Sequence, residues 1–288
     1  ILTPQAGRSY SHVSKLRMVM QELFRQARRS RILLYDPAEG LQLPESVKGT
    51  HRPITNQERR HILALAQTHP SGLWVLTILY TGLRPGETAA LLWKDIDFAR
   101  NEIHVYKAVE SGTRAIKAPK TPKTPAGVRD IPMRPELRDR LLAARGAPES
   151  PVFPSARGGV RSANSLRRLW NAFARDLDLR MGAKVRDGEV VQHAIAPDLT
   201  PYCLRHTFCT DLQRAGVPIN VAKELMGHAN ISVTANIYTH RDQKVLHSNM
   251  AKLTPRGQRA AAKRLGAGGT AERDKLAAGD RDGETKEE

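Results

Sequence analysis

The chain has 288 residues, enough for one large domain or two modest ones, and a formal net charge of +17. Its last 38 residues hold nine Lys or Arg and seven Asp or Glu, so an excess of 15 positive charges remains in the first 250 residues. We therefore expect a polyanionic partner, most simply nucleic acid, while two cysteines and the lack of a long apolar run argue against a disulfide framework and a membrane protein.

Residues 11–30 are predicted to form an amphipathic helix. One side carries apolar residues at helical spacing, which we expect to be buried: Leu16, Val19, Met20, Leu23, Phe24 and Ala27. On or near the opposite side are arginines that are well placed for phosphates: Arg25, Arg28, Arg29 and Arg31. A charged helix face is as often only solvated, so this pattern alone does not decide between the two. A linker-like stretch, residues 45–53, follows.

Two further helices are predicted before the first candidate site residue. Thr55 and Glu58 have the spacing of a capping box, and residues 71–80 form an apolar run typical of a core helix. Arg84 then stands at the start of another helix, with a proline at the first helical position and Glu87 in the first turn. Taken alone, Arg84 is explained best by simple pairing with Glu87.

The middle of the chain is predicted to contain a small sheet followed by helices. Residues 102–109 and 128–132 alternate as strands do, and a turn rich in Lys, Thr, Pro and Gly lies between them. Residues 135–145 and 162–179 are predicted helices, and residues 180–197 a loop or short hairpin. The second of these helices has an apolar side that we expect to face inward: Leu166, Leu169, Trp170 and Phe173.

The stretch from Thr200 to His240 carries the chemistry. A helix is predicted to begin at Thr200 and to close at Gly216. Tyr202 and Arg205, three residues apart, project from one side of it. Its buried stripe is predicted to consist of residues four apart: Leu204, Phe208 and Leu212.

Two short helices are predicted to follow. The first runs from Pro218 to about Met226 and ends at Gly227-His228, and the second carries Tyr238. Two basic groups and two tyrosines therefore gather on three consecutive short helices. This grouping indicates a functional site rather than only a core.

These residues resemble the C-terminal catalytic boxes of the tyrosine recombinase (phage integrase) family. The family pattern is H-x-x-R-H, then G-H, then a nucleophilic tyrosine further along the chain. Five positions match it: Arg205, His206, Gly227, His228 and Tyr238. One position departs, because Tyr202 stands where the family has its first histidine. A tyrosine is a poor base at neutral pH, so a general-base role at this position is put in doubt.

The resemblance extends upstream to two more boxes. The stretch T-G-L-R-P-G-E is similar to the family's first box, which makes Arg84 the first catalytic arginine and Glu87 its supporting carboxylate. The family places a catalytic lysine in a hairpin of the form K-T-x-x-x-x-R-x-I-P. Lys123 with Arg129 fits that spacing, and Lys120, which repeats the local K-T-P, is the competing candidate.

The resemblance implies a fold that is mostly α with a small antiparallel sheet (α+β), a catalytic domain preceded by part of a helical core-binding domain. Residues 1–50 would be the C-terminal part of the core-binding domain and residues 51–250 the catalytic domain. Residues 251–288, rich in Gly, Ala and charge, would be a disordered tail. Only the second half of the core-binding domain would be present, so we expect that the chain, which begins at Ile1, is a fragment.

The resemblance also implies the chemistry. Arg84 and Arg205 would grip the non-bridging oxygens of a DNA phosphate, His228 would donate a further hydrogen bond, and Tyr238 would attack to form a 3′-phosphotyrosyl link. Lys123 would act as general acid, and Tyr202 would donate a hydrogen bond. No cofactor and no metal are expected. The one weak metal pattern, Cys203, His206 and Cys209, surrounds a single helix without a fourth ligand.

The function implied is that of a site-specific recombinase or integrase that moves a mobile element. The expected partners are double-stranded DNA attachment sites, further copies of the chain in a homo-tetramer on paired sites, and accessory DNA-bending or directionality factors; no membrane partner is expected. We expect a cytoplasmic protein that associates with the bacterial nucleoid when acting. Two alternatives stay open: a type IB topoisomerase-like enzyme that relaxes DNA, and a catalytically silent DNA-binding relative.

Overall fold

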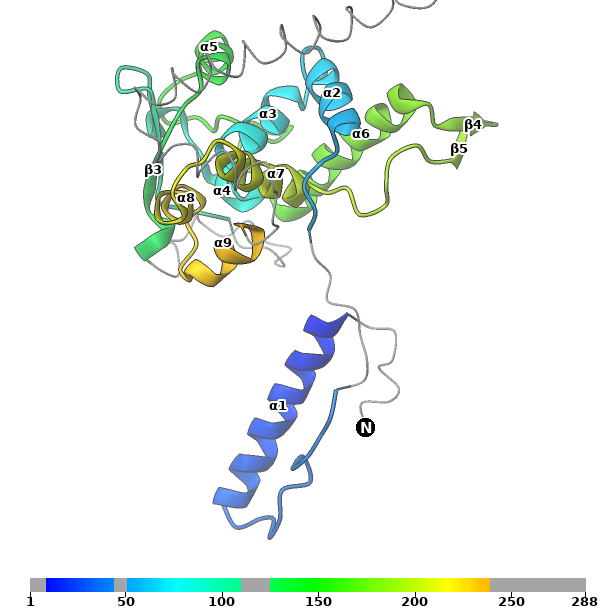
Figure 1. Cartoon of the computed structure of the whole chain (residues 1–288), viewed down its shortest axis with the longest axis vertical. Helices are drawn as coiled ribbons and strands as arrows, with labels where there is room; N and C mark the ends of the chain where they lie inside the picture. Colours follow the sequence, from blue (N-terminus) through cyan, green and yellow to red (C-terminus); the bar gives the residue numbers. More distant parts are fainter. Residues whose placement is uncertain (1–8, 44–50, 110–124, 239–288) are drawn as a thin grey trace, which may run out of the picture. The chain divides into compact units, whose positions relative to one another are not determined.

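The structure, a computed structural model, describes residues 9–43, 51–109 and 125–238. The chain divides into two compact units, Ile1–Pro53 and Ile54–Glu288, and each is described by itself (Figure 1). The predicted disordered tail, residues 251–288, lies outside the described residues.

The first unit is built on α1 (Tyr10–Arg29), which the periodicity of the sequence predicts, but its apolar side is not buried as expected. Val19 and Leu23 are exposed, and in residues 9–43 the buried hydrophobic residues are Val13 and Ala38. The remaining apolar residues of the predicted face are only half-buried: Leu16, Met20, Phe24 and Ala27. Within the described part of this unit, only the segment after α1 runs back beside the helix, and one segment cannot cover a whole helix face (Figure 1).

The second unit is mostly helical, as the sequence predicts. Its helices, in chain order, are α2 (Asn56–Leu65), α3 (Gly72–Thr81), α4 (Pro85–Ala90), the 3₁₀ turns η2 (Trp93–Asp95) and η3 (Pro125–Gly127), α5 (Pro135–Ala143), α6 (Ala163–Met181), α7 (Pro201–Arg214), α8 (Ile219–Met226) and α9 (Ile231–Tyr238). The predicted capping box at the start of α2 is confirmed, because Thr55 Oγ1 accepts the Glu58 amide at 3.1 Å and Glu58 Oε2 accepts the Thr55 amide at 2.7 Å.

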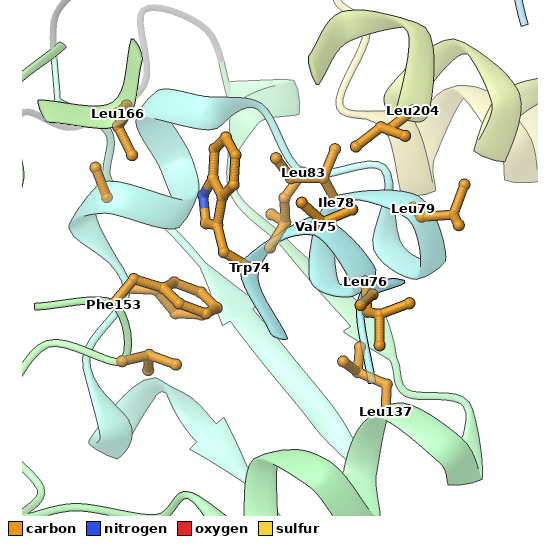
Figure 2. Close-up of a cluster of buried hydrophobic side chains, with 14 of the residues drawn as sticks. Trp74, Val75, Leu76, Ile78, Leu79, Leu83, Leu137, Phe153, Leu166 and Leu204 are labelled. Carbon is orange, nitrogen blue, oxygen red and sulfur yellow. The ribbon is translucent and has the colours of Figure 1, made fainter. Parts of the chain in front are cut away.

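The core is centred on α3, whose side chains are buried all round. Trp74, Val75, Leu76, Ile78 and Leu79 pack among side chains from α4–α7 and the loops between them (Figure 2). A helix that is apolar on all sides needs partners on all sides, and α3 contacts α4, α5 and α7. The helix α3 thus packs against both α4 and α7, the helices that carry Arg84 at the N-cap and Arg205.

A three-stranded antiparallel sheet covers one side of this unit, with strand order β1-β2-β3. The strands are β1 (Ile96–Asp97), β2 (Glu102–Val105) and β3 (Arg129–Pro132). Ile103 pairs with both Ile96 and Ile131, so one column of isoleucines faces the core. Side chains alternate between the faces of a strand, so Arg129 shares the inner face with Ile131. The predicted strand pair is confirmed, but the first strand ends earlier than expected and β1 is additional.

Residues 184–192 form a short hairpin, within residues 180–197, for which the sequence predicts a loop or short hairpin. Strands β4 (Lys184–Arg186) and β5 (Glu189–Gln192) join through Asp187 and Gly188, whose φ values are 52° and 82°. Two consecutive residues with positive φ are typical of a type I′ turn.

The apolar stripe predicted for α7 is only partly correct. Leu204 is fully buried, but Phe208 and Leu212 are half-buried. The buried positions lie on both sides of Leu204, with Cys203 and Thr207 on one side and Arg205 and Cys209 on the other. The reason is that α7 contacts three helices, α3, α8 and α9, so its burial is not confined to one stripe. None of the helices in the described ranges is both long and apolar enough to span a membrane.

Candidate active site

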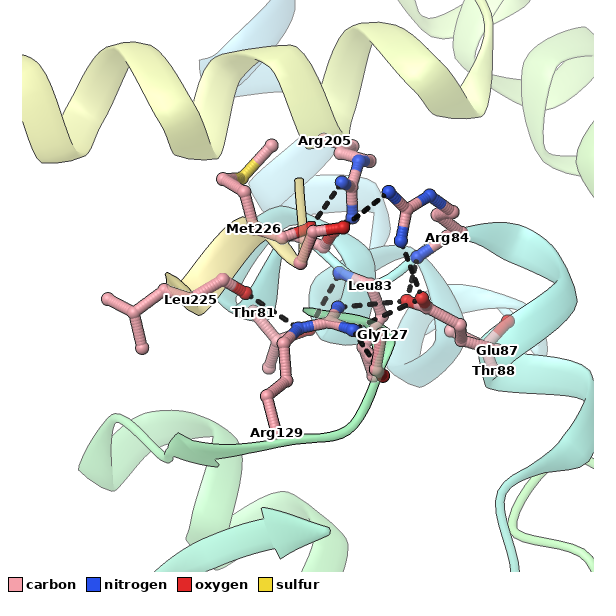
Figure 3. Close-up of polar contacts among 12 residues, drawn as sticks. Thr81, Leu83, Arg84, Glu87, Thr88, Gly127, Arg129, Arg205, Leu225 and Met226 are labelled. Carbon is pink, nitrogen blue, oxygen red and sulfur yellow. Dashed lines mark hydrogen bonds and ion pairs between the residues drawn. The ribbon is translucent and has the colours of Figure 1, made fainter. Parts of the chain in front are cut away.

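The site is organised around a single buried carboxylate, Glu87, in the first turn of α4 (Figure 3). Its Oε1 accepts from Arg84 Nη1 at 2.8 Å and from Arg129 Nη1 at 3.2 Å. Its Oε2 accepts from the Arg84 amide at 2.8 Å and from Arg129 Nη2 at 2.9 Å. Burial alone raises the pKa of Glu87, but the hydrogen bonds from Arg129 and the charges of Arg129, Arg205 and Arg84 outweigh it and lower the pKa to about 2. Glu87 is therefore ionised at neutral pH.

Arg84 is the N-cap residue of α4 and the most accessible of the three arginines. Its side chain is 36% exposed, compared with 2% for Arg129. In addition to its contacts with Glu87, Nη2 donates to the Gly227 carbonyl at 2.9 Å. Pairing with Glu87 and a functional role are thus compatible, because Arg84 pairs with Glu87 and part of its side chain is still exposed to solvent.

Arg205 lies in the second turn of α7 and is 5% exposed. Its two terminal nitrogens donate to the carbonyls of Gly82, which ends α3, and Met226, which ends α8. Burial and the neighbouring charge of Arg84 lower the pKa of Arg205 to about 9. The guanidinium therefore stays protonated at neutral pH and joins α3, α7 and α8 in the place where Arg84 also lies (Figure 3).

His228 follows the turn that ends α8. The turn needs Gly227, whose φ is +62° and whose added Cβ would lie 2.7 Å from Arg129 Nη1. His228 is 8% exposed, and its Nδ1 lies 2.9 Å from the Thr234 hydroxyl of α9. Burial, followed by the charges of Arg205, Arg84 and Arg129, lowers the pKa of His228 to about 4. The imidazole is consequently neutral at pH 7.

Of the two candidate tyrosines, the structure describes the side chain of Tyr202 but only the backbone of Tyr238. Tyr202 lies in the first turn of α7 and is 42% exposed, whereas Arg205, three residues on, is buried. Tyr238 is the last residue of α9, a helix that contacts both α7 and α8. The position of its side chain lies outside the described part of the structure.

The two candidate lysines, Lys120 and Lys123, fall in residues 110–124 and also lie outside the described residues. The structure resumes directly after them at η3, which leads into β3 and Arg129. The choice between the two lysines therefore stays a prediction.

Sequence reasoning missed two residues of the site. Arg129 served only as a spacing marker for the lysine box, yet its side chain is buried against Glu87. The alternation of β3, which places it on the same face as Ile131, was the available signal. The sequence does not indicate a role for Thr234, because nothing in a short helix distinguishes this threonine until its contact with His228 is known.

The described residues offer no group of three or more His, Cys, Asp or Glu side chains placed to hold a metal ion. Cys203 and Cys209 are both buried in α7. The Cys203 thiol lies 3.4 Å from the Thr200 amide and 3.3 Å from the Asp198 carbonyl, so it contacts the start of the helix.

Comparison with known proteins decides the family. The sequence model of the phage integrase family matches residues 52–244, which is more than half of the chain. The chain belongs to the phage integrase family. Proteins of this family, the tyrosine recombinases, cleave and rejoin DNA.

Two curated relatives illustrate the match. A tyrosine recombinase XerC-like protein of Caldanaerobacter subterraneus is 26% identical over 250 residues, covering 82% of this chain and 64% of the relative. The transposase from transposon Tn916 of Enterococcus faecalis is 29% identical over 212 residues, covering 71% of this chain and 52% of the relative. The chain thus spans between about half and two thirds of the length of these relatives.

Solved structures support the fold. The Tn1549 transposon integrase, in a complex with circular intermediate DNA, aligns with a TM-score of 0.69 at 24% identity, covering 87% of this chain and 82% of that chain. A lambda integrase dimer bound to a core site aligns with a TM-score of 0.53 at 17% identity, covering 81% and 61%. The predicted fold class, mostly α with a small antiparallel sheet in a tyrosine recombinase catalytic domain, is confirmed.

Proposed function

We propose that this chain is a site-specific recombinase that cleaves and rejoins duplex DNA through a 3′-phosphotyrosyl intermediate, integrating or excising a mobile element. The observation that carries the proposal is the convergence of Arg84, Arg205 and His228. They come from the start of α4, from α7 and from the turn after α8. Arg84 donates to Glu87 and to the Gly227 carbonyl, Arg205 donates to the carbonyl of the preceding Met226, and His228 directly follows Gly227. Such a cluster suits a phosphodiester whose negative charge increases in the transition state.

Each residue then has a role. Arg84, the more exposed arginine, binds a non-bridging oxygen of the phosphate, and the buried Arg205 adds positive charge beside Arg84. Neutral His228 donates a hydrogen bond from the ring nitrogen that Thr234 leaves available. Tyr202, at the exposed start of α7, donates a hydrogen bond from its hydroxyl. The site needs no metal for this role, because cationic side chains supply the charge.

Cleavage exchanges a phosphodiester bond for a phosphotyrosyl bond. The Tyr238 hydroxyl gives its proton to water, and its oxygen forms a bond to phosphorus while the bond from phosphorus to the 5′-oxygen breaks. The leaving 5′-oxygen takes a proton from Lys123, with Lys120 as the competing donor. Attack by a 5′-hydroxyl on the phosphotyrosyl bond reverses the steps and rejoins the strand. The energy of the phosphodiester is kept in the covalent link.

The proposed partners are two DNA attachment sites, held by four copies of the chain, with accessory factors that bend DNA or set direction. The test is incubation with a duplex of the attachment site that carries a nick close to the cleavage position. Cleavage releases a short strand that dissociates, so the enzyme cannot rejoin the DNA and the covalent adduct accumulates. The proposal expects a covalent protein–DNA adduct that survives denaturation. A protein that binds the duplex and forms no adduct would be the silent relative, and one that relaxes supercoils without exchanging strands between two sites would be topoisomerase-like.

A further inference from the structure

Arg129 joins three segments of the site while having almost no access to solvent. Its side chain is 2% exposed. Nε donates to the Leu225 carbonyl at 2.8 Å, Nη1 to the Gly127 carbonyl at 3.3 Å, and both terminal nitrogens contact Glu87. The residue thus connects the end of α8, the segment after the candidate lysines, and the first turn of α4 (Figure 3). A side chain so enclosed cannot contact DNA.

Glu87 is shared between two arginines, and the sharing is unequal. Arg129 approaches with both terminal nitrogens, one to each carboxylate oxygen, in the bidentate arrangement that arginine forms most strongly with a carboxylate. Arg84 reaches the same carboxylate with a single side-chain nitrogen, Nη1. Its other terminal nitrogen is turned to the Gly227 carbonyl instead.

This division has a consequence for the charge at the substrate side. Were Arg129 missing, the buried carboxylate would have Arg84 as its only direct side-chain partner among these arginines. A bidentate Arg84–Glu87 pair would then be favoured, and it would direct the guanidinium of Arg84 inward and cancel its charge. Arg205 could not replace Arg129, because its terminal nitrogens are committed to the carbonyls of Gly82 and Met226.

We propose that Arg129 is a positioning residue that occupies Glu87 and so keeps the Arg84 guanidinium out of a bidentate pair with Glu87 and turned toward the DNA phosphate. The close approach of Arg129 to Gly227 supports the same role, since the carbonyl of Gly227 is the second anchor of Arg84. The proposal rests on the proposed function and adds to it a residue that acts through Glu87 and not on DNA.

The test is a double-mutant cycle between Arg129→Met and Glu87→Gln. The glutamine keeps the shape of the Glu87 side chain but not its charge. The single-turnover rate of adduct formation and the dissociation constant for the duplex are measured for each variant. The matched control is Arg138→Met, which removes a half-exposed arginine that pairs only with Asp139 among the described ion pairs. Melting temperatures show whether each variant is folded. If Arg129→Met does not fold, Arg129→Lys replaces it, because lysine keeps the charge but cannot contact both oxygens of Glu87.

We expect Arg129→Met to slow adduct formation at least tenfold while the duplex dissociation constant changes less than twofold, with Arg129→Lys intermediate and Arg138→Met unchanged. The double variant should be no slower than the slower single variant, because the carboxylate that captures Arg84 is gone. Rate losses that multiply in the double variant, or that only follow the folded fraction, would overturn the role of Arg129. Failure of the unmodified protein to form an adduct would instead overturn the proposed function.

Discussion

The Nδ1 atom of His228 lies 2.9 Å from the hydroxyl of Thr234, across the turn that joins α8 to α9. Thr234 is completely buried, so water cannot replace this contact. A neutral imidazole has one N–H, and a threonine hydroxyl that donates to Nδ1 leaves the proton on Nε2. The contact therefore holds the imidazole ring in place, and with the hydroxyl as donor it leaves Nε2–H to donate a hydrogen bond to a phosphate.

Replacing Thr234 with valine should therefore slow adduct formation without unfolding the protein. Valine keeps the shape of the side chain and removes a hydrogen bond worth roughly 0.5–1.5 kcal/mol, so we expect a loss of about threefold to tenfold in the single-turnover rate. Thr234→Ser, which restores the hydroxyl, is the control and should recover most of the rate. A serine variant as slow as the valine variant would show that the hydroxyl is not what matters.

The lowered pKa of His228 predicts how stability changes with pH. An unfolded histidine titrates near 6.5, and folding lowers the pKa of His228 to about 4, so between these values the unfolded chain binds more protons. The free energy of unfolding should accordingly rise with pH from about 4 to 6.5, by at most roughly 1.4 kcal/mol per pH unit from this residue.

The measurement is denaturant unfolding across that range for the unmodified protein and for His228→Gln. Because other histidines also titrate, the quantity to compare is the difference between the two proteins. Glu87 does not interfere, since its pKa of about 2 places most of its own contribution at more acid pH. A difference that stays constant between pH 4 and 6.5 would contradict the buried, neutral histidine.

Arg84 and Arg205 should respond differently to the same substitution by lysine. Lysine cannot reach both carbonyls that Arg205 pairs with, Gly82 and Met226, and an unpaired buried carbonyl costs about 1–3 kcal/mol. Arg84→Lys leaves the Gly227 carbonyl without its arginine donor, but the lysine side chain at this half-exposed site can still contact Glu87.

We therefore expect Arg205→Lys to lower the free energy of unfolding by about 1–3 kcal/mol and Arg84→Lys by less than about 1 kcal/mol. Both should slow adduct formation by roughly a hundredfold or more, since Arg84→Lys removes a fork of donors to the transition state and Arg205→Lys moves a buried positive charge away from its two carbonyls beside Arg84. Unfolding curves and single-turnover rates measured on the same preparations separate the two effects. Equal losses of stability would argue against the division between an exposed and a buried arginine.

The elements that could be predicted from the sequence are those with a local signal. The capping box at Thr55, the apolar run of α3 and the proline at the start of α4 each depend on residues a few positions apart. The two-residue strand β1 has too few residues to show an alternation. The exposure of Val19 and Leu23 could not be predicted either, because helical periodicity shows which side of a helix is apolar but not whether another segment covers that side.

The site divides in the same way. The grouping of Arg84, Arg205 and His228 in space was implied by a known pattern and is present in the structure, while their roles remain predictions. The burial of Arg129 could not be predicted, because a charged residue is expected at the surface unless a buried carboxylate is known to pair with it. Such a pairing joins β3 to α4, and no short-range rule connects residues so far apart in the chain.

The choice between Lys123 and Lys120 can be tested with a chemically altered substrate. In a 5′-bridging phosphorothiolate the leaving group is a thiolate, which departs without a proton from a general acid. Lys123→Ala should be slow on ordinary DNA and near the unmodified rate on the phosphorothiolate. Lys120→Ala should need no such rescue, and rescue of Lys120→Ala alone would transfer the role to Lys120.

The central claim, that the chain cuts DNA by covalent catalysis through Tyr238, is tested most directly by Tyr238→Phe on the nicked duplex. Phenylalanine removes only the attacking oxygen, so the variant should bind the duplex as the unmodified protein does and form no adduct that survives denaturation. Tyr202→Phe, the matched control, should form the adduct more slowly, because it loses one hydrogen bond and keeps the nucleophile. An adduct that persists in Tyr238→Phe, or one that disappears in Tyr202→Phe alone, would contradict the account.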